Sequence, residues 1–425
     1  MAADGTLIVG ASQAGVQLAI SLRQLGYSAP ITLVGAEPHP PYQRPPLSKA
    51  VLHGGAEADA LLLRSPAFYA EQDITLVGGE RIVGIERGPD GSGHATTAGG
   101  RRLPFARLAL ATGARPRRLD IPGAELDGVH VLRGMDHALA LRDELDRARS
   151  AVVVGGGFIG LEVAASLRRH DVAVTVVCDV DRLMDRAVGP IMSEAFRVAH
   201  VARGVDVRLR TRPTRIIGDG AQKATGVLLS DGSTVPADLV VIGIGAIPRT
   251  ELAEQLGLDV AGGIVVDEHC VASDGTTVAA GDCVSCPNPT GGEPAFLRFE
   301  SVSTAIEQAR VAAASIAGAP TPYRVTPWFW SDQYDLKLQV AGIPFDPDQT
   351  VVRGDPGSER FSVLSYRAGR LIAIECVNRP ADFLAVRTAL GSGRTIPAEP
   401  AADADTPLKH LVRDDPVAAG QAGAS

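Results

Sequence analysis

The chain has 425 residues, a length that suggests two or three domains with sizeable cores. Its net charge of −8 and its pI near 5.6 argue against a general nucleic-acid binder. The first residues lack the basic stretch of a signal peptide, and no apolar run reaches the ~18 residues needed to span a bilayer. We therefore expect a cytoplasmic protein.

In chain order, the first predicted element is a buried strand at 6–9, which leads into the turn GASQAG at 10–15. A helix at 16–25 and a strand at 31–34 follow, so this stretch has the order of a dinucleotide-binding unit. An acid after the second strand is well placed to accept hydrogen bonds from ribose hydroxyls. The residues expected to hold a dinucleotide here are Gly10, Ser12 (at the usual middle glycine), Ala14, Gly15 and Glu37.

The next segment, HPPYQRPPLSK at 39–49, is stiffened by prolines that favour an extended chain, and Ser48 favours the start of a helix. Arg44 and Lys49 bring positive charge beside the expected dinucleotide, although two solvated surface cations are the alternative. Residues 73–110 have the pattern of short strands with glycine turns. They end in the small-residue turn Ala111, Thr112 and Gly113, which lets the backbone approach a flavin closely.

The strongest signal is AVVVGGGFIGLE at 151–162, a buried strand followed by a G-x-G-x-x-G turn and a helix predicted over 159–169. The helix N-terminus then faces the phosphates with its positive dipole end. Two such turns, about 145 residues apart, suggest a permanently held flavin and an exchangeable nicotinamide. The residues expected to bind NADH are Gly155, Gly157, Phe158, Ile159, Gly160 and Asp179, and the helix is expected to bury Ile159, Leu161, Val163 and Leu167.

The strand at 172–177 departs from the usual pattern, because Cys178 stands where an acid is expected and Asp179 follows one position late. Asp179 is the candidate for the adenine ribose of NADH, whereas Arg182 offers an alternative contact for the 2′-phosphate of NADPH. NADPH is therefore the less favoured of the two nucleotides.

A strand at 239–244 closes this unit, and the stretch Thr277 to Asp282 has the pattern of a strand, a glycine and an acid. Asp282 is placed to bind a flavin ribityl hydroxyl, although it also suits a simple turn. A helix over 300–317 begins near Val302, so its positive end favours the anionic reduced flavin.

The remainder is predicted to contain strands at 338–340, 361–366 and 371–377, the last two forming a hairpin, and then a short helix after Pro380. Trp328 and Trp330 stand at its entrance. Bunched aromatics favour a core, and the alternative is a partly exposed ring beside the flavin, for which Trp330 is the candidate, or at a docking face.

None of the five cysteines precedes residue 178. The pair Cys283 and Cys286 has redox or metal spacing but lacks a partner motif, so it is interpreted as a chance surface pair.

Six segments in this order resemble the bacterial NADH-dependent ferredoxin reductases of the putidaredoxin reductase type, which serve cytochrome P450 and aromatic-ring dioxygenase systems. They are RPPLSK at 44–49, LATGARPR at 110–117, GGGFIGLE at 155–162, AAGDC at 279–283, ESV at 300–302 and WFWSDQY at 328–334. The resemblance implies a glutathione-reductase-like α/β fold with two Rossmann-type domains and an α+β C-terminal domain. The expected FAD-binding domain comprises 1–116 and 245–325, the NADH-binding domain 117–244 and the C-terminal domain 326–412; the Ala- and Gly-rich stretch 413–425 is expected to be a disordered tail.

The resemblance also implies site residues. Lys49 and Glu162 match a pair beside flavin N5, and Phe158 is expected to shield the flavin until the nicotinamide stacks there. Positions matched to FAD contacts are Ala14, Glu37, Lys49, Ile82, Arg133, Asp282 and Val302.

The implied activity passes electrons from NADH through FAD, one at a time, to a [2Fe–2S] ferredoxin. A hydride carries two electrons and the cluster accepts one, so a flavin is needed between them. Because such ferredoxins and this chain are both acidic, docking requires a local basic patch. Candidates for that patch are Arg64, Arg298, Arg310, Lys337 and Lys409.

Two alternatives share the fold. An NADH oxidase, peroxidase or CoA-disulfide reductase needs a redox cysteine beside the flavin, which the cysteine positions disfavour. A redox-sensing flavoprotein similar to apoptosis-inducing factor would react slowly with every acceptor.

Overall fold

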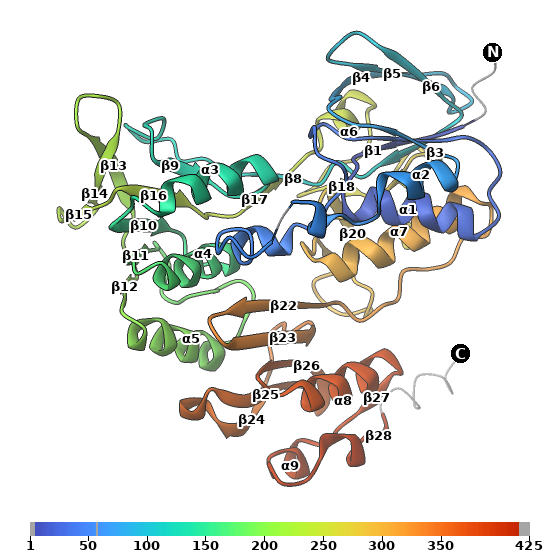
Figure 1. Cartoon of the computed structure of the whole chain (residues 1–425). Coiled ribbons are helices and arrows are strands. Elements are labelled where there is room, and N and C mark those ends of the chain that lie inside the picture. The colour runs from blue at the N-terminus through green and yellow to red at the C-terminus, as the bar shows by residue number, and fades with distance from the viewer. Residues whose placement is uncertain (1–4, 57, 416–425) are drawn as a thin grey trace. The chain divides into compact units, whose positions relative to one another are not determined.

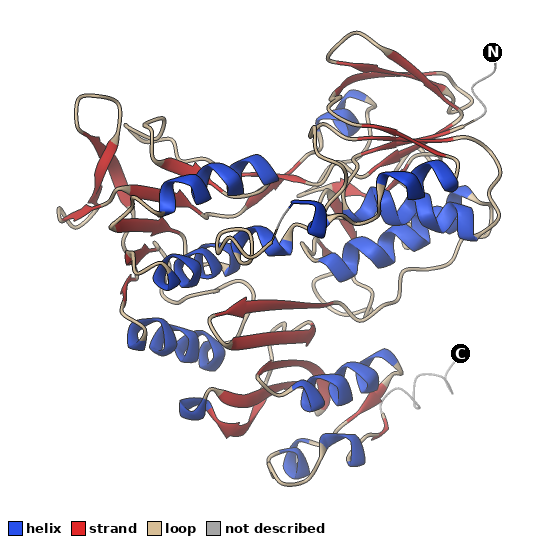
Figure 2. Cartoon of the chain, in the orientation of Figure 1, coloured by secondary structure: helices blue, strands red, loops and turns tan. Residues whose placement is uncertain are grey.

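The computed structural model describes residues 5–56 and 58–415 (Figure 1). Within them the chain divides into two compact units, one containing 5–43, 58–115 and 247–327 and the other containing 44–56, 116–246 and 328–415. Helices and strands alternate along much of both units, as Figure 2 shows, which confirms the predicted α/β class. The short strands β8 (Ala114–Pro116) and β17 (Ala246–Pro248) pair where the chain passes between the units.

The first unit is built on a five-stranded parallel sheet whose strands end level with one another. Val9 lies opposite both Val34 and Leu110, and Leu110 lies opposite Ala279. All four side chains of the central strand are buried, as expected for a parallel sheet covered on both faces. In sheet order the strands are β19 (Val278–Ala279), β7 (Arg107–Leu110), β1 (Thr6–Val9), β2 (Ile31–Val34) and β3 (Ile74–Val77).

Helices α1 (Gln13–Gln24) and α7 (Val302–Ile316) pack against each other beside this sheet (Figure 1). Both have a continuous row of buried small and aliphatic side chains, and this pattern allows close helix packing. The unit also contains α2 (Pro66–Glu71), α6 (Glu251–Gln255), the antiparallel strands β4 (Ile82–Arg87), β5 (Gly93–Thr97) and β6 (Arg102–Phe105), the small sheet of β18 (Ile264–Val265), β20 (Val284–Pro287) and β21 (Phe296–Leu297), and a 3-10 helix at Ala58–Leu61.

The second unit repeats the parallel design. Val154 lies opposite Val177 and Ile242, and Ile242 lies opposite Val131, so these strands also end level. The strands in order are β12 (Val205–Arg208), β11 (Ala173–Val177), β10 (Ser150–Val154), β16 (Leu239–Ile242) and β9 (Val129–Val131). With them are α3 (Met135–Leu145), α4 (Phe158–Arg169), α5 (Pro190–Ala202), the antiparallel strands β13 (Pro213–Gly218), β14 (Ala224–Leu229) and β15 (Thr234–Pro236), and a 3-10 helix at Pro45–Ser48.

The C-terminal part of the second unit is an antiparallel sheet with helix α8 (Pro380–Gly391) packed on β23 and β26. In sheet order its strands are β22 (Trp328–Gln333), β23 (Leu336–Gly342), β26 (Arg370–Val377), β25 (Arg360–Arg367) and β24 (Gln349–Asp355). The predicted hairpin of β25 and β26 is confirmed. Short elements complete it: α9 (Ala398–Ala401), β27 (Arg394–Thr395), β28 (Arg413–Asp414) and 3-10 helices at Pro356–Ser358 and Leu408–His410.

Four local predictions differ from the structure. Residues 45–48 form a 3-10 helix instead of an extended segment, because consecutive prolines also suit the first positions of a helix, and Ser48 ends it rather than capping a new one. Ile159 is 46% exposed, whereas the other three predicted core residues of α4 are fully buried, because Ile159 lies in the first turn, where no neighbouring element covers it. The helix after Pro380 has 12 residues and is not short.

The fourth difference concerns the expected disordered tail: Arg413 and Asp414 pair with β27, and residues 416–425 lie outside the described residues. No helix among the described residues is both long enough and apolar enough to span a membrane.

Candidate functional site

The predicted flavin residues of the first unit gather at the edge where its parallel strands end. Gly10 follows β1, Ala111 follows β7, and Asp282 follows β19 by three residues. Gly10 has a φ of +120°, and a Cβ atom there would lie 2.0 Å from the Ala111 carbonyl oxygen. The turn therefore requires glycine. Ligands of open parallel sheets bind outside this edge, so the geometry fits a dinucleotide.

Two helices begin at the same edge. Ala14 lies in the first turn of α1 and Val302 is the first residue of α7. Between them is Gly281, where a Cβ would meet the Cβ atoms of Ala14 at 3.1 Å and Ala305 at 3.8 Å. The Ser12 side chain makes no capping hydrogen bond to α1. Two positive helix ends converging on one edge suit the anionic parts of a bound flavin dinucleotide.

Glu37 follows β2 at this edge and is half-buried. The Tyr42 hydroxyl donates a 2.5 Å hydrogen bond to its Oε2 atom. Tyr42 was not predicted from sequence, because nothing in the spacing distinguished it from the other residues of the proline segment. The carboxylate is thus held in place within its own unit.

The turn at 111–113 contributes backbone rather than side chains. The Thr112 hydroxyl donates to the Arg249 carbonyl oxygen at 2.7 Å, and the Arg249 N–H donates to the Gly113 carbonyl oxygen at 2.9 Å. Ile82 begins β4 and its side chain is 7% exposed, packed in the core.

The second unit has a matching glycine turn after β10. Gly155 has a φ of +109°, and a Cβ there would lie 2.4 Å from the Gly243 carbonyl oxygen. A Cβ at Gly160 would lie 2.3 Å from the Gly155 carbonyl oxygen. At Gly157, the N-cap of α4, nothing lies within 4 Å of such a Cβ. The protein itself requires the first and third glycines, whereas the second leaves open space where a pyrophosphate fits.

The side chain of the cysteine after β11 packs inward, against the glycine turn and the core. Cys178 is 5% exposed, and a Cβ at Gly156 would lie 3.1 Å from its sulfur. Burial raises the pKa of the Cys178 thiol to about 11. Asp179 is exposed. The side chain of Cys178 is therefore a core group, and Asp179 is the acid that remains at the edge.

Arg182 does not offer the free cation that the NADPH alternative needs. Its guanidinium donates to the carbonyl oxygens of Val188 at 2.5 Å and Asp185 at 2.6 Å, and it pairs with the Asp185 carboxylate at 3.0 Å. These contacts are made within its own loop.

Lys49 and Glu162 form an ion pair in the second unit, with 2.6 Å between Nζ and Oε2. Glu162 is 4% exposed. The Ser48 hydroxyl donates to the same oxygen at 2.5 Å, and the Ser331 hydroxyl donates to Oε1 at 2.7 Å. The carboxylate thus accepts three hydrogen bonds, of which the two serine contacts were not predicted.

Aromatic side chains lie on α4, which carries Glu162, and on β22, which carries Ser331. Phe158 precedes Glu162 by four residues on α4, so the two share a helix face, and its ring lies 5.0 Å from that of Phe329. Trp330 is half-buried and stacks on Trp328, with 5.6 Å between ring centroids. Arg44 donates to the Arg133 carbonyl oxygen at 2.7 Å, which brings together two of the three cations of this unit that are predicted to contact the flavin.

All five cysteines are buried, which corrects the expectation of a surface pair at Cys283 and Cys286. Both belong to the core of the first unit; Cys286 lies on the buried strand β20, and Cys283 directly precedes that strand. Burial raises the pKa of each thiol, that of Cys286 to about 11. Among residues 5–56 and 58–415, no three or more His, Cys, Asp or Glu side chains are grouped to hold a metal ion.

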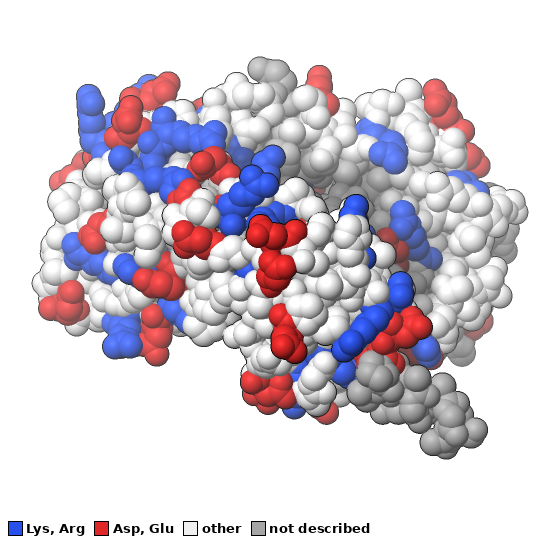
Figure 3. All heavy atoms as spheres, turned by 90° about the horizontal axis from the view of Figure 1, so that it is seen from below, with Lys and Arg blue, Asp and Glu red and all other residues white. Residues whose placement is uncertain are grey.

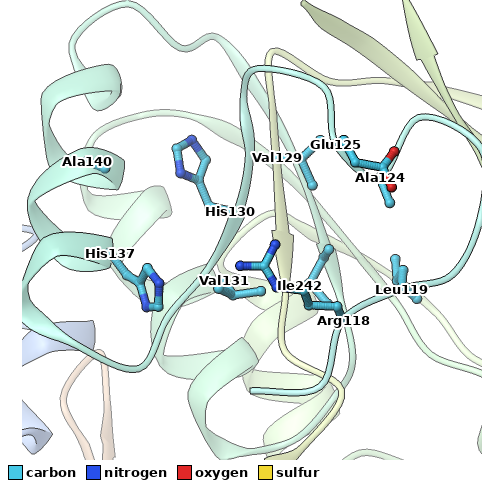
Figure 4. A pocket seen from close by; sticks show the side chains of 10 residues that line it. All are labelled: Arg118, Leu119, Ala124, Glu125, Val129, His130, Val131, His137, Ala140 and Ile242. Atoms are coloured by element: carbon cyan, nitrogen blue, oxygen red, sulfur yellow. The ribbon is translucent and has the colours of Figure 1, made fainter. Parts of the chain in front are cut away.

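A cavity of about 170 Å³ lies between α3, β9 and the 118–125 segment (Figure 4). Arg118, Glu125, His130 and His137 contribute its polar side chains, and His130 lies 3.1 Å from the Glu144 carboxylate. None of the predicted site residues lines it.

The basic residues predicted for docking are partly neutralised. Arg298 pairs with Glu300, and Arg310 pairs with Glu307 at 2.6 Å. Arg64 lies over the Phe68 ring, while Lys337 and Lys409 are exposed. Figure 3 shows positive and negative side chains interspersed on the face that it presents.

Comparison with known proteins identifies the family. The family profile of pyridine nucleotide-disulphide oxidoreductases matches residues 5–315, and the reductase C-terminal profile matches residues 328–412. Rhodocoxin reductase of Rhodococcus erythropolis is 44% identical over 406 residues, which cover 96% of this chain and 94% of that protein. The chain belongs to the putidaredoxin reductase-like ferredoxin reductase family.

Solved structures agree with this membership. The ferredoxin reductase for the CYP199A2 system from Rhodopseudomonas palustris is 42% identical with a TM-score of 0.92, covering 96% of this chain and 100% of that chain. The covalent putidaredoxin reductase–putidaredoxin complex is 37% identical with a TM-score of 0.92, covering 99% and 100%. This family member is therefore an oxidoreductase with the glutathione-reductase-like fold, and its family implies FAD and NAD(P)H as cofactors.

Proposed function

We propose that this ferredoxin reductase family member passes electrons from NADH through FAD to a [2Fe–2S] ferredoxin that supplies a cytochrome P450 or a ring-hydroxylating dioxygenase. The observation that carries the proposal is the presence of two glycine turns of the same geometry, one at the strand ends of each unit. Two such turns suit two dinucleotides. The relatives are named for small redox partners, rhodocoxin and putidaredoxin.

The turn of the first unit is assigned to FAD and that of the second to NADH. In the first unit the proposed FAD residues are Gly10, Ser12, Ala14, Gly15, Glu37, Ile82, Ala111, Thr112, Gly113, Asp282 and Val302. The family resemblance adds Arg44, Lys49, Arg133 and Trp330 from the second unit. The proposed NADH residues are Gly155, Gly157, Phe158, Ile159, Gly160 and Asp179.

FAD, when bound, supplies the conversion of a two-electron hydride donor into two one-electron transfers. The protein groups bind and orient. Phe158 covers the nicotinamide position until NADH enters, and Lys49 brings positive charge to the reduced flavin. Glu162 holds the Lys49 ammonium in place through their 2.6 Å contact.

NADH is the proposed donor because the acid at the second edge is exposed and the neighbouring arginine is engaged. A carboxylate at Asp179 accepts hydrogen bonds from ribose hydroxyls and repels a 2′-phosphate. Arg182 is held by the Val188 and Asp185 carbonyl oxygens and the Asp185 carboxylate.

Disulfide-type chemistry is disfavoured by the state of the thiols. All five cysteines are buried, and burial raises the pKa of every one, those of Cys178 and Cys286 to about 11 and that of Cys376 to about 12. A nucleophilic or redox-active cysteine needs thiolate character and access. A CoA-disulfide or peroxidase reaction therefore has no suitable thiol here.

For ferredoxin docking we propose Lys337 and Lys409, two exposed candidates that both belong to the C-terminal part of the second unit, as part of the contact face. Reversal of both charges to Glu is expected to raise the ferredoxin KM and to leave reduction of a small dye unchanged, because rim charges act on association. Equal loss with dye and ferredoxin would place the docking face elsewhere.

The test of the proposal is an anaerobic titration of the purified holoprotein with NADH and, separately, with NADPH, following the flavin absorbance. Fast bleaching by NADH with a long-wavelength charge-transfer band supports the assignment. Bleaching by NADPH alone would overturn the NADH assignment, and slow bleaching by both would favour a sensor.

A further inference from the structure

A line of hydrogen-bonded side chains runs through the second unit from the Glu162 carboxylate. The Ser331 hydroxyl donates to Glu162 Oε1 at 2.7 Å, and the Gln333 amide nitrogen donates to Ser331 Oγ at 3.2 Å. His200 Nε2 lies 2.8 Å from Gln333 Oε1, and the Tyr334 hydroxyl lies 3.1 Å from His200 Nδ1. These residues come from α4, β22 and α5, with Tyr334 just beyond β22.

The line is closed to water along most of its length. Ser331, Gln333 and His200 are all 0% exposed and Glu162 is 4% exposed, whereas Tyr334 is half-buried. Buried polar groups need partners, and in this line each of them has one.

The donors in the line all point toward Glu162. Ser331 has a single hydroxyl hydrogen, which goes to the carboxylate, so its oxygen must accept from Gln333. The Gln333 amide nitrogen also faces the Met184 sulfur at 4.0 Å, an atom that only accepts, so the amide orientation follows from two contacts.

The orientation of Gln333 then determines the histidine. Gln333 Oε1 is an acceptor, so His200 carries its proton on Nε2, and its Nδ1 accepts from the Tyr334 hydroxyl. Burial lowers the pKa of His200 to about 4, which agrees with a neutral ring.

This arrangement does not suit proton transport. An amide side chain between Ser331 and His200 cannot accept and release a proton without leaving its neutral form. The line is instead an ordered set of donors, in which each partner fixes the orientation of the next.

We infer that Ser331, Gln333 and His200 are positioning residues that hold the Glu162 carboxylate so that its second oxygen faces the Lys49 ammonium. Glu162 Oε1 is held by the line, and Oε2 receives Lys49 at 2.6 Å and Ser48 at 2.5 Å. Without the Ser331 donor, only Oε2 is held, so the carboxylate loses the contact that fixes its rotation and the ammonium moves with it.

The inference rests on the proposed function, which assigns the Lys49 charge to the reduced flavin. Holding that charge in place stabilises the reduced state and the transfer that forms it. Residues that never touch the flavin then affect its potential.

Two substitutions test the line. Ser331→Ala removes the donor to Glu162 and leaves a side chain that fits the same space. Gln333→Glu keeps the size of the side chain and the acceptor for His200. It replaces the donor to Ser331 with an acceptor, so the new carboxylate and that of Glu162 compete for the one hydroxyl hydrogen of Ser331. Tyr334→Phe is the matched control, because it removes only the hydroxyl at the far end.

The holoproteins are compared by the midpoint potential of the flavin, by anaerobic stopped-flow reduction with NADH, and by thermal unfolding. For Ser331→Ala and Gln333→Glu we expect a limiting reduction rate roughly tenfold lower, with the NADH Kd changed less than about threefold. The midpoint potential is expected to fall by about 30 mV, a tenfold change for a two-electron couple. Lys49→Met is expected to shift the potential in the same direction and further.

The flavin midpoint potential of Tyr334→Phe is expected to stay within about 10 mV of that of the unsubstituted protein, which corresponds to a twofold change. Potentials within that limit for both Ser331→Ala and Gln333→Glu, even with lower melting temperatures, would overturn the inference and leave the proposed function standing. Failure of the unsubstituted holoprotein to be reduced by NADH would instead overturn the proposed function.

Discussion

The two glycine turns of this chain have nearly the same backbone and different surroundings. At Gly10 and Gly155 the φ angles are +120° and +109°, and in both turns an added Cβ would strike a carbonyl oxygen of the neighbouring strand end. The acid after the next strand distinguishes them. Glu37 is half-buried and bonded by the Tyr42 hydroxyl, whereas the second turn has the buried Cys178 and the exposed Asp179.

This difference matches the proposed division of labour. A ribose partner held by a neighbouring side chain is preorganised, which favours long residence of the ligand. An exposed acid with water around it must exchange that water for the ligand at each binding event, which suits a ligand that comes and goes. The comparison teaches that one backbone motif stands in two different side-chain settings, as we propose for a resident cofactor in one unit and an exchangeable one in the other.

The largest expected effects come from the glycines themselves. Gly10→Ala is expected to abolish flavin binding, whereas Gly155→Ala is expected to retain flavin and lose NADH affinity by roughly 100-fold or more, since both place a Cβ against backbone. Flavin absorbance per protein and NADH titration measure the two effects. If Gly155→Ala loses flavin as readily as Gly10→Ala, the two turns do not have separate ligands.

Gly157→Ala is the control for the glycine comparison. Nothing in the protein lies within 4 Å of a Cβ at this position, so stability is expected to hold while NADH affinity falls. Unchanged affinity would mean that the pyrophosphate does not approach Gly157.

The acid of the second turn is expected to have the next largest effect. Asp179→Ala should raise the NADH KM roughly tenfold, because a charged acceptor for the ribose hydroxyls is lost, while flavin content stays constant. The matched control is Asp181→Ala, another exposed acid in the same loop, which pairs with Arg210. Equal KM values for the two variants would show that Asp179 does not bind the ribose.

A smaller effect is expected from a carboxyl that braces the second turn. Glu375 on β26 is 1% exposed and accepts the Gly189 N–H at 2.7 Å, and the same loop bonds the turn through Met184 N–H to the Gly156 carbonyl oxygen at 2.8 Å. Burial raises the pKa of Glu375 from 4.5 to about 7.

The folded state therefore keeps the Glu375 proton that the unfolded state releases, and the free energy of unfolding falls as pH rises from about 4.5 to about 7. Glu375→Gln removes this dependence. The unfolding free energy of the variant minus that of the unsubstituted protein is therefore expected to be about 1–3 kcal/mol larger at pH 8 than at pH 5. Urea unfolding of both proteins at several pH values measures it. A stability difference that does not vary with pH would show that Glu375 is ionised throughout.

The smallest effect is expected at Cys178. Its sulfur faces the glycine turn and the core, so Cys178→Ala is expected to cost about 1 kcal/mol of unfolding free energy and to change NADH kinetics less than twofold. Thermal unfolding and steady-state kinetics test this together. A loss of NADH affinity as large as that of Asp179→Ala would place the thiol at the ribose.

The two turns show how far sequence reasoning reaches. Strand, glycine and helix spacing predicted both of them and strand β2 to the residue, because these signals are local. The inward side chain of Cys178 was not predictable, since its direction depends on the packing of Gly156 and Leu183. Ile159 was placed in the core by helical periodicity, which takes no account of where the sheet ends.

The candidate site was predictable where motifs carry it and not where distant segments meet. Lys49 and Glu162 came from the family resemblance. Ser331 and His200 did not, because their relation to Glu162 depends on β22, which lies more than 100 residues beyond both α4 and α5 in sequence. Buried polar networks depend on tertiary contacts that no local pattern records.

The most direct test of the account is the stoichiometry of anaerobic turnover with NADH and a [2Fe–2S] ferredoxin, with rhodocoxin and putidaredoxin as the acceptors used. The account predicts that, with at least one of these two ferredoxins, two clusters are reduced for each NADH that is oxidised. Oxidation of NADH that reduces neither ferredoxin would contradict it.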